Sequence, residues 1–515
     1  MILIITFVLF LYALYVFSTK NHNYWKKRNI KHDPPIPLFG NHFVNQFGYK
    51  SITQVATELY NRYPEEKVVG YYQGTTPLLL VRDLEIVRRI LTADFSHFYL
   101  RGLGRNPDVE PIFTNLFHTE GDSWKLLRQR LTPTFTTAKL KAMFPLVVEC
   151  AKKLQGVAEG VAKRNESCDV RELVARFTTE FIGACGFGIN MDTINNEKSM
   201  FRNLGKLITS SRSLGLIAKY MLWENFPYVR KFLYVGDRRI EESIVEILQQ
   251  IRKKRNYKPS GRNDFIDLLL ELEAQGKITG ESIEKRNSDG TPKCIEMDMD
   301  MNCMVGQVFV FFAAGFETSS SASSYTLHQL AYNPDIQRQV QENIDEVLNK
   351  YNGELCYDAI AEMKLLSMAF KEAMRMFPSL GVLSRVCARR YTIPELNNTI
   401  DPGVKILIPL EGIQNDEKYF TNPKEFRPQR FSPEAMKEQQ KFSYMPFGEG
   451  PRACIGARLG EMQSLAGLAA ILHKFTVEPA PSSRLEVQID TTMNVIQKLE
   501  GGLYLTLKSR KSKDE

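Results

Sequence analysis

The stretch Phe447-Gly448-Glu449-Gly450-Pro451-Arg452-Ala453-Cys454-Ile455-Gly456 decides the fold of this chain. Its pattern, Phe-x-x-Gly-x-Arg-x-Cys-x-Gly, includes a rare Cys, and average residue usage produces such a match by chance in roughly one of ten thousand chains of this length. A helical pattern over residues 455–475 follows, so Cys454 stands at a helix N-terminus, where the dipole lowers the pKa of a thiol. Gly448 and Gly450 allow a tight turn. The segment therefore predicts a thiolate that is presented by a tight loop.

A second group of polar residues lies inside an apolar helical pattern over residues 305–330, in Ala313-Ala314-Gly315-Phe316-Glu317-Thr318-Ser319. Burying an acid and a hydroxyl in such a helix costs free energy. A carboxylate beside a hydroxyl can relay protons, which makes Glu317 and Thr318 the predicted catalytic residues. The alternative is a bent helix in which Thr318 bonds the carbonyl one turn earlier.

Two further pairs are placed by helical spacing. Glu372 and Arg375 are three residues apart and therefore share one helix face, and Arg430 follows in the segment 426–431. Trp124 and Arg128 lie one helical turn apart. Each pair alone is common in helical proteins, and a single Arg is usually an exposed charge. Their meaning therefore depends on the other motifs.

Together, and in this order, these motifs resemble the cytochrome P450 family over essentially the whole chain. Segments 177–180, 309–318 and 442–448 resemble the insect microsomal branch that is often called family six. Gln414 departs from the resemblance, because His is expected there, but it puts no catalytic role in doubt. The resemblance implies a mainly α fold with minor β, in which one large haem-binding helical domain with small sheets follows an N-terminal membrane anchor.

The resemblance also implies roles for individual residues. Cys454 ligates the iron of haem b, and a thiolate ligand favours O–O cleavage. Phe447 and Gly448 shape the ligand loop, and Gly315 leaves room for dioxygen, to which Glu317 and Thr318 assist proton delivery. The residues expected to bind the haem propionates are Trp124, Arg128, Arg385, Arg452 and, from its place before the Trp helix, Arg101. The structural network near the haem comprises Glu372, Arg375 and Arg430.

A monooxygenase activity follows from the resemblance. The protein would take electrons singly from NADPH–cytochrome P450 reductase, without binding NADPH itself, and insert one oxygen atom of O2 into its substrate. The family's pocket segments place six residues at the substrate: Phe113, Phe117, Phe309, Ala313, Val382 and Leu499. This apolar lining predicts a lipophilic ligand. Xenobiotics such as plant toxins and insecticides are expected by association only, and hormone or pheromone metabolism stays open.

Two other functions remain open from the sequence. A haem-thiolate isomerase or dehydratase needs no external electrons, although such members tend to lose the acid–Thr pair. A haem sensor or carrier needs neither an apolar pocket nor a reductase. For the monooxygenase, a basic face with Lys125, Arg128 and Arg130 would suit an acidic reductase surface. Cytochrome b5 is a further expected partner, and no nucleic acid is expected.

The N-terminus has the pattern of a membrane anchor. Residues 1–19 are almost wholly apolar and just long enough to span a bilayer. A cleaved signal peptide is disfavoured, because no Lys or Arg precedes the apolar stretch. The basic residues that follow it place the body on the cytosolic side of the endoplasmic reticulum membrane: Lys20, Lys26, Lys27, Arg28 and Lys31. Trp25 is expected at the membrane surface.

The chain is expected to divide into an anchor over residues 1–19, a basic and proline-rich linker over 20–40 that acts as a stiff spacer, and a monooxygenase domain over 41–515. Its hydrophobic fraction of 43% and charged fraction of 24% suit a globular body, and its net charge of +8 suits a membrane or another anionic partner. The cysteines form no Cys-x-x-Cys pair, which disfavours a zinc or iron–sulfur site.

Most of the residues between 121 and 350 have helical periodicity, interrupted by a polar, helix-poor stretch at 285–293. Two strands are expected at 68–72 and 77–81, and short strands at 393–409. The alternating tail over 485–507 predicts a final hairpin.

Overall fold

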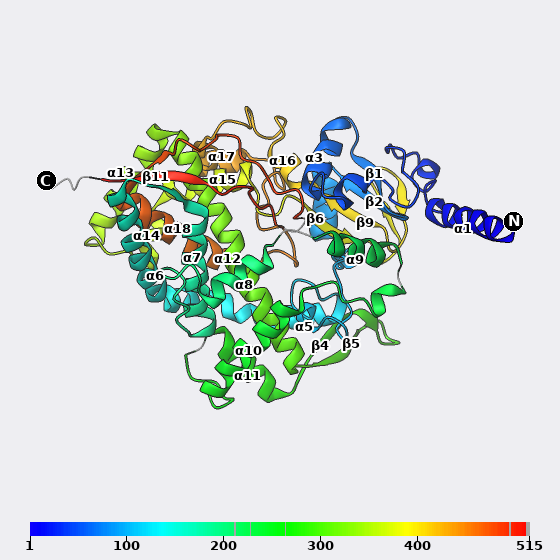
Figure 1. Cartoon of the computed structure of the whole chain (residues 1–515), viewed down its shortest axis with the longest axis horizontal. Coiled ribbons are helices and arrows are strands. Elements are labelled where there is room, and N and C mark those ends of the chain that lie inside the picture. Colours follow the sequence, from blue (N-terminus) through cyan, green and yellow to red (C-terminus); the bar gives the residue numbers. More distant parts are fainter. Residues whose placement is uncertain (211–212, 227, 263, 494–495, 511–515) are drawn as a thin grey trace.

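One long helix, α12 (Met301–Tyr332), runs through the middle of the body in the computed structural model (Figure 1). The structure describes residues 1–210, 213–226, 228–262, 264–493 and 496–510. Asp300 caps α12 by accepting a hydrogen bond from the Cys303 amide at 2.8 Å. The helix is apolar and long enough to cross a membrane, but half of its most apolar window is buried inside the protein. Its composition therefore reflects its place in the core.

Helices packed around α12 make the protein mainly α, as predicted. Their apolar residues recur at helical spacing, as in α10 (Arg238–Lys254), which buries Ile244, Leu248 and Ile251. The other helices of the body are α5 (Gly121–Leu131), α6 (Thr137–Arg164), α7 (Val170–Ile182), α8 (Met200–Ile208), α9 (Leu214–Asn225), α11 (Phe265–Gln275), α13 (Pro334–Lys350), α14 (Tyr357–Glu362), α15 (Lys364–Met376), α16 (Leu410–Gln414), α17 (Pro433–Glu438) and α18 (Ala457–Lys474).

A four-stranded sheet forms the end of the body nearest the N-terminal helix (Figure 1). Its strand order is β1 (Val68–Gln73), β2 (Thr76–Val81), β9 (Lys405–Ile408) and β6 (Leu383–Val386). The antiparallel pair β1–β2 is the predicted one, and β9 runs parallel to β2. Three short helices belong to this end: α2 (Phe43–Gln46), α3 (Ile52–Arg62) and α4 (Leu84–Arg88).

The remaining sheets are small. A three-stranded sheet has the order β10 (Phe475–Pro479), β11 (Tyr504–Ser509), β3 (Ser167–Asp169), and a two-stranded one joins β7 (Tyr391–Ile393) to β8 (Asn398–Ile400). The predicted hairpin over 485–507 is largely wrong. Only a single bridge, Ile489 to Leu499, forms among its described residues, because β11 pairs with β10 and β3 instead. Residues 494–495 of this segment lie outside the described part of the chain.

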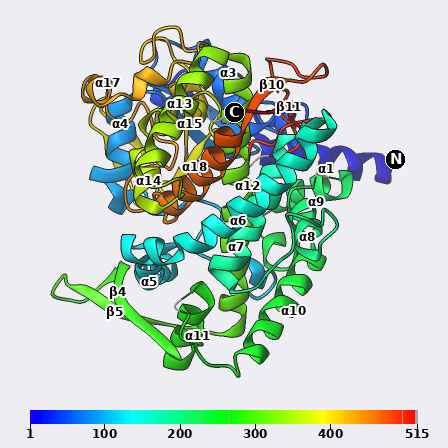
Figure 2. The ribbon, with the colours of Figure 1, turned by 90° about the vertical axis from the view of Figure 1, so that its left-hand side faces the viewer.

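A hairpin interrupts the helical region, where the sequence indicated only a polar gap. β4 (Lys277–Arg286) pairs with β5 (Pro292–Asp298) in antiparallel register. The turn between them contains Asp289-Gly290, a dipeptide favoured in hairpins, and Gly290 has a φ of 84°. This turn was the sequence signal for the two strands. The hairpin projects beside α5 at the edge of the molecule (Figure 2).

The N-terminal helix α1 (Ile2–Thr19) extends away from the body with its apolar side chains exposed, as a membrane anchor requires (Figure 1). The expectation that Trp25 lies at the membrane surface is wrong. Its side chain is fully buried against Gly70, and its indole N–H donates to the Tyr71 carbonyl at 3.0 Å. The chain therefore docks onto β1 within a few residues of the anchor.

A buried charge network joins α15 to the segment before the ligand loop. Arg375 Nε and Nη2 donate to the two carboxylate oxygens of Glu372 at 2.7 and 3.0 Å, and neither side chain is exposed. Arg430 Nε donates to the same carboxylate at 3.2 Å. Arg375 also donates to the carbonyls of Gln414 and Pro423. The residues predicted to form a structural network therefore do lie together.

Glu372→Gln should destabilise the protein by about 3–5 kcal/mol, because it leaves the buried Arg375 guanidinium without its counter-charge. The exposed pair Arg427–Glu425, at 3.7 Å, provides a matched control, since Glu425→Gln should change stability by less than about 0.5 kcal/mol. Urea unfolding midpoints of the two variants measure the difference. Equal midpoints would show that the network adds no stability.

Candidate functional site

The ligand loop has the tight turn that its glycines predict. Gly448 and Gly450 have φ values of 69° and 75°, in the left-handed region. The amide of Cys454 donates to the Phe447 carbonyl at 2.8 Å, which closes the loop. α18 begins three residues after Cys454. The loop therefore ends at a helix N-terminus and presents the thiol there.

Cys454 is exposed, its neighbours Ala453 and Ile455 are partly exposed, and Arg452 is buried. Enclosure by the surrounding protein raises the pKa of this thiol, while the Gly456 amide and the Arg128 and Arg101 guanidiniums act to lower it. The helix end therefore acts on the thiol pKa in the expected direction, but enclosure by the protein has the larger effect in the chain alone. A bound cation at the sulfur would favour the thiolate.

Four arginines surround the loop: Arg101, Arg128, Arg385 and Arg452. Burial lowers the pKa of Arg101 to about 10, and burial with repulsion from Arg101 lowers that of Arg385 to about 9. Burial, followed by repulsion from Arg101, lowers the pKa of Arg452 to about 8. The negative charge of Glu120 acts to raise the pKa of all three arginines. One carboxylate thus faces several buried guanidiniums.

The arginines of this cluster come from separate elements. A bridge between Leu100 and Val386 places Arg101 beside Arg385, which lies on β6. On α5, Arg128 donates to the Ala453 carbonyl at 2.8 Å. The second predicted residue of α5, Trp124, has its ring 4.0 Å from the Arg452 guanidinium. Two strands, a helix and the ligand loop therefore meet beside Cys454.

Arg452 is already satisfied by protein acceptors. Its guanidinium donates to the carbonyls of Tyr99 and Thr119 and to Glu120 at 3.0 Å. Arg101 donates to the carbonyls of Phe117 and Arg452. By contrast, Nε of the buried Arg385 has no hydrogen-bond partner. A ligand with two carboxylates would supply both the missing acceptor and the missing negative charge.

One side of α12 is exposed although most of the helix is buried. Ala314 is exposed and Thr318 is partly exposed, while Phe312 and Phe316 are fully buried. The Thr318 hydroxyl donates to the Ala314 carbonyl at 2.7 Å. This bond is the one that the alternative interpretation of Thr318 requires, so the relay role of this hydroxyl stays a prediction.

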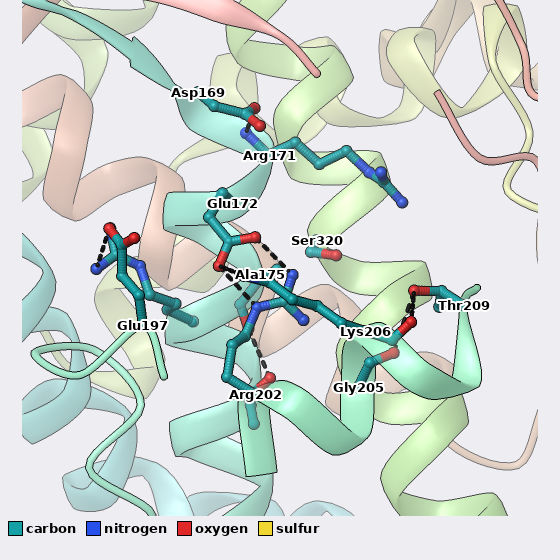
Figure 3. Close-up of polar contacts among 12 residues, drawn as sticks. Asp169, Arg171, Glu172, Ala175, Glu197, Arg202, Gly205, Lys206, Thr209 and Ser320 are labelled. Atoms are coloured by element: carbon teal, nitrogen blue, oxygen red, sulfur yellow. Dashed lines mark hydrogen bonds and ion pairs between the residues drawn. The ribbon is translucent and has the colours of Figure 1, made fainter. Parts of the chain in front are cut away.

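Glu317 points to another side of α12 from Thr318. It is buried and forms an ion pair with Arg171 of α7. This pair borders a polar cavity of about 160 Å³ between α7, α8 and α12, which also includes Glu172, Arg202 and Lys498. Figure 3 shows Glu172 bound to Arg202, with Arg171 directed toward α12. Glu317 would have to leave Arg171 to reach the Thr318 side of the helix.

The predicted substrate residues are only partly brought together. The rings of Phe113 and Phe309 meet edge to face at 6.1 Å. Phe117, Ala313 and Val382 are partly exposed, as residues that border a cavity are. Leu499 is 3% exposed and packs in the main apolar core, so its expected place at the substrate is wrong. Its bridge to Ile489 turns this segment inward.

A larger cavity of about 670 Å³ lies where the end of α1 meets the body. Phe17 and Lys20 line it together with Trp223 and Phe226 near the end of α9, and the rings of Phe17 and Phe226 stack at 6.0 Å. It includes none of the predicted substrate residues. Glu120, from the arginine cluster, borders its inner side.

Comparison with known proteins settles the family. The family model described as Cytochrome P450 matches residues 31–505. The chain belongs to the cytochrome P450 family. It is 36% identical to cytochrome P450 6B2 of Helicoverpa armigera over 97% of this chain and 96% of that protein. It is 35% identical to cytochrome P450 6a2 of Drosophila melanogaster over 94% and 95%, and 33% identical to cytochrome P450 6B1 of Papilio polyxenes over 96% and 97%.

Membership makes this P450 a haem-thiolate monooxygenase. The site residues fit the group, because the loop offers an accessible cysteine and the arginine cluster lacks anionic charge. Haem b, with a cysteine thiolate on iron, is its cofactor, and NADPH acts through a reductase as is typical of the family. The resemblance to insect family-six proteins, found from the motifs, is confirmed.

Two residues of the site were missed from the sequence, and a third, Gln414, was noted only as a departure from the resemblance. Glu120 is the carboxylate of the arginine cluster, and Arg171 holds Glu317. Gln414 is fully buried; its amide donates to the carbonyls of Met374 and Arg375 at 3.1 Å and accepts from the Met445 amide at 3.0 Å. Only Gln414 had a signal, since it replaces an expected His.

Gly450→Ala should abolish haem incorporation, whereas Gly448→Ala should retain it. A Cβ at Gly450 would overlap the Leu91 carbonyl oxygen, while one at Gly448 would lie 3.9 Å from its nearest neighbour. Both variants bear the cost of a left-handed backbone, about 1–2 kcal/mol, so only the clash differs. Haem content per protein in the purified variants measures the effect. Equal haem content would contradict the steric argument.

Proposed function

We propose that this protein inserts one oxygen atom of O2 into lipophilic small molecules, with electrons that originate from NADPH. The observation that carries the proposal is the accessible Cys454 beside a buried, under-neutralised arginine cluster. Haem bound there supplies oxygen activation and one-electron redox chemistry. Cys454 would hold the iron, Phe447 and Gly448 would shape the ligand loop, and Trp124, Arg101, Arg128, Arg385 and Arg452 would bind the propionates.

Thr318 and Glu317 are proposed to assist proton delivery on the distal side. The Thr318 hydroxyl donates to the Ala314 carbonyl and keeps its lone pairs available, so it can accept a hydrogen bond from water and hold that water where a proton is delivered. Glu317 restores the proton from its side of α12, where a polar cavity adjoins it. Its ion pair with Arg171 has to open for this step.

A lipophilic substrate is supported by the aromatic pair Phe113–Phe309 and by Phe117, Ala313 and Val382 around it. Xenobiotics such as plant toxins and insecticides are the proposed class, from the resemblance to the insect branch. The anchor helix α1 and the basic residues after it support the endoplasmic reticulum membrane, with the body on the cytosolic side. NADPH–cytochrome P450 reductase is the proposed donor, with cytochrome b5 as a second partner.

Reduced protein with carbon monoxide should show the strongly red-shifted Soret band of a thiolate-bound haem. Cys454→Ser should lose this band, because an alcohol does not supply the thiolate. Cys387→Ser, at a buried cysteine on the sheet side, serves as the matched control and should retain it. A red-shifted band in the Cys454 variant, or its absence in haem-loaded wild type, would overturn the ligand assignment.

Thr318→Ala should keep haem but release reduced oxygen as peroxide, because proton delivery is weakened without the hydroxyl. Product formed per NADPH consumed should fall by about tenfold, within the range of lost acid–base catalysis. Thr326→Ala, on the buried part of the same helix, is the control, since its hydroxyl also bonds the carbonyl four residues earlier. Unchanged coupling in Thr318→Ala would remove this residue from the relay.

A further inference from the structure

The β4–β5 hairpin is fastened to α5, the helix that contacts the ligand loop. Asp122 at the start of α5 accepts hydrogen bonds from the Ser282 hydroxyl at 2.8 Å and from the Ile283 amide at 2.7 Å. Beyond it, Arg389 donates to the carbonyl of Ile283. Figure 2 shows the hairpin lying along α5 and projecting past it. The hairpin therefore has a fixed place beside this helix.

Acceptor groups of the hairpin contact two of the α5 cations that were expected to face a partner protein. Lys125 lies 4.0 Å from Glu281, and Arg130 donates to the Thr279 carbonyl at 2.9 Å. Arg128 points inward to the Ala453 carbonyl. Each side chain of the predicted basic face therefore has a partner within the protein, although Arg130 stays exposed and its carbonyl partner leaves its charge unopposed.

The hairpin carries its own cations beyond α5. Lys285, Arg286 and Lys293 are all exposed, and within the described residues none of them forms an ion pair. Arg286 is paired with Pro292 across the strands, next to Lys293, and Lys285 precedes it in an irregular part of β4. These three cations, which have no acidic partner in the described part of the chain, are therefore available to a negatively charged surface.

Two acids of the hairpin are paired with lysines away from its outer end, and one lies in the turn. Glu281 faces Lys125, and Glu296 pairs with Lys277 at 2.6 Å near the base. Asp289 in the turn accepts hydrogen bonds from the amide and hydroxyl of Thr291. Asp289 keeps its negative charge at the outer end, but it is one carboxylate beside the three cations Lys285, Arg286 and Lys293, so residues 285–293 are net positive.

We propose that the outer end of the β4–β5 hairpin, defined by Lys285, Arg286 and Lys293, is a docking surface for the acidic face of the flavoprotein that supplies electrons. The proposal rests on the proposed function, because it identifies where that donor binds. The two proteins would recognise each other by opposite charge. Helix α5, which the hairpin contacts, reaches the Cys454 loop through the hydrogen bond from Arg128 to the Ala453 carbonyl.

An anionic membrane is the other partner with suitable charge, but the geometry disfavours it. In Figure 2, α1 leaves the body on the side opposite to the hairpin. A bilayer that contains α1 would therefore lie on the opposite side of the body from the hairpin, and attraction to its headgroups is screened over about 8 Å at physiological salt. A protein partner that approaches from the α5 side meets no such obstacle.

The test uses the full chain in vesicles with NADPH–cytochrome P450 reductase, and compares wild type with the variant K285E/R286E/K293E. The KM for the reductase should rise by about tenfold at low salt, and its dependence on salt should weaken, because rim charges act mainly on association. Peroxide-supported oxidation of a lipophilic probe, which needs no reductase, should be unchanged. The variant K253E/K254E/K258E, at the end of α10, is the matched control and should leave the KM for the reductase unchanged.

An unchanged KM in the hairpin variant, or an equal rise in the α10 control, overturns the docking surface. Loss of binding to anionic vesicles with an unchanged KM for the reductase assigns the cations to a membrane and also overturns it. If the triple variant loses its haem, K285Q/K293Q is measured in its place by the same criteria. Absence of peroxide-supported oxidation in wild type would instead count against the proposed function and leaves the KM comparison to decide the docking surface.

Discussion

The repulsion among the buried arginines beside Cys454 is the constraint on which the rest of the site depends. Arg101, Arg385 and Arg452 come from different parts of the chain, and Glu120 alone opposes their charge in each case. The cluster is held by carbonyl acceptors and by the ring of Trp124. A ligand with two carboxylates completes this balance, so binding of the cofactor and ordering of the site are one process.

The two residues predicted to relay protons, Thr318 and Glu317, lie on different sides of α12. Successive residues of a helix point about 100° apart, so Thr318 and Glu317 cannot share one surface of α12. The hydroxyl lies on the partly exposed side, and the carboxylate is held by Arg171 beside a polar cavity. A relay built from neighbouring residues therefore needs a side-chain rearrangement, and Arg171 determines where the carboxylate rests.

The fold class, α12, the β1–β2 pair and the Glu372 network were predictable, because periodicity and motif spacing report local structure. The position of Trp25 was not, since its burial depends on Gly70, far along the chain. The β4–β5 pairing and the inward place of Leu499 also depend on long-range contacts. Within the site, sequence spacing found the arginines, but the pairings of Glu120 and Arg171 join residues that no local pattern connects.

Gln414 gives the junction between α15 and the segment before Cys454 a property that His would lack. Its amide donates twice and accepts once without changing its charge. A neutral imidazole has one donor and one acceptor, and it gains a proton near a pH of about 6.5. The three bonds of Gln414 therefore form in a single protonation state, and the alignment of the ligand loop with the core is insensitive to acidification over the range in which a histidine would titrate.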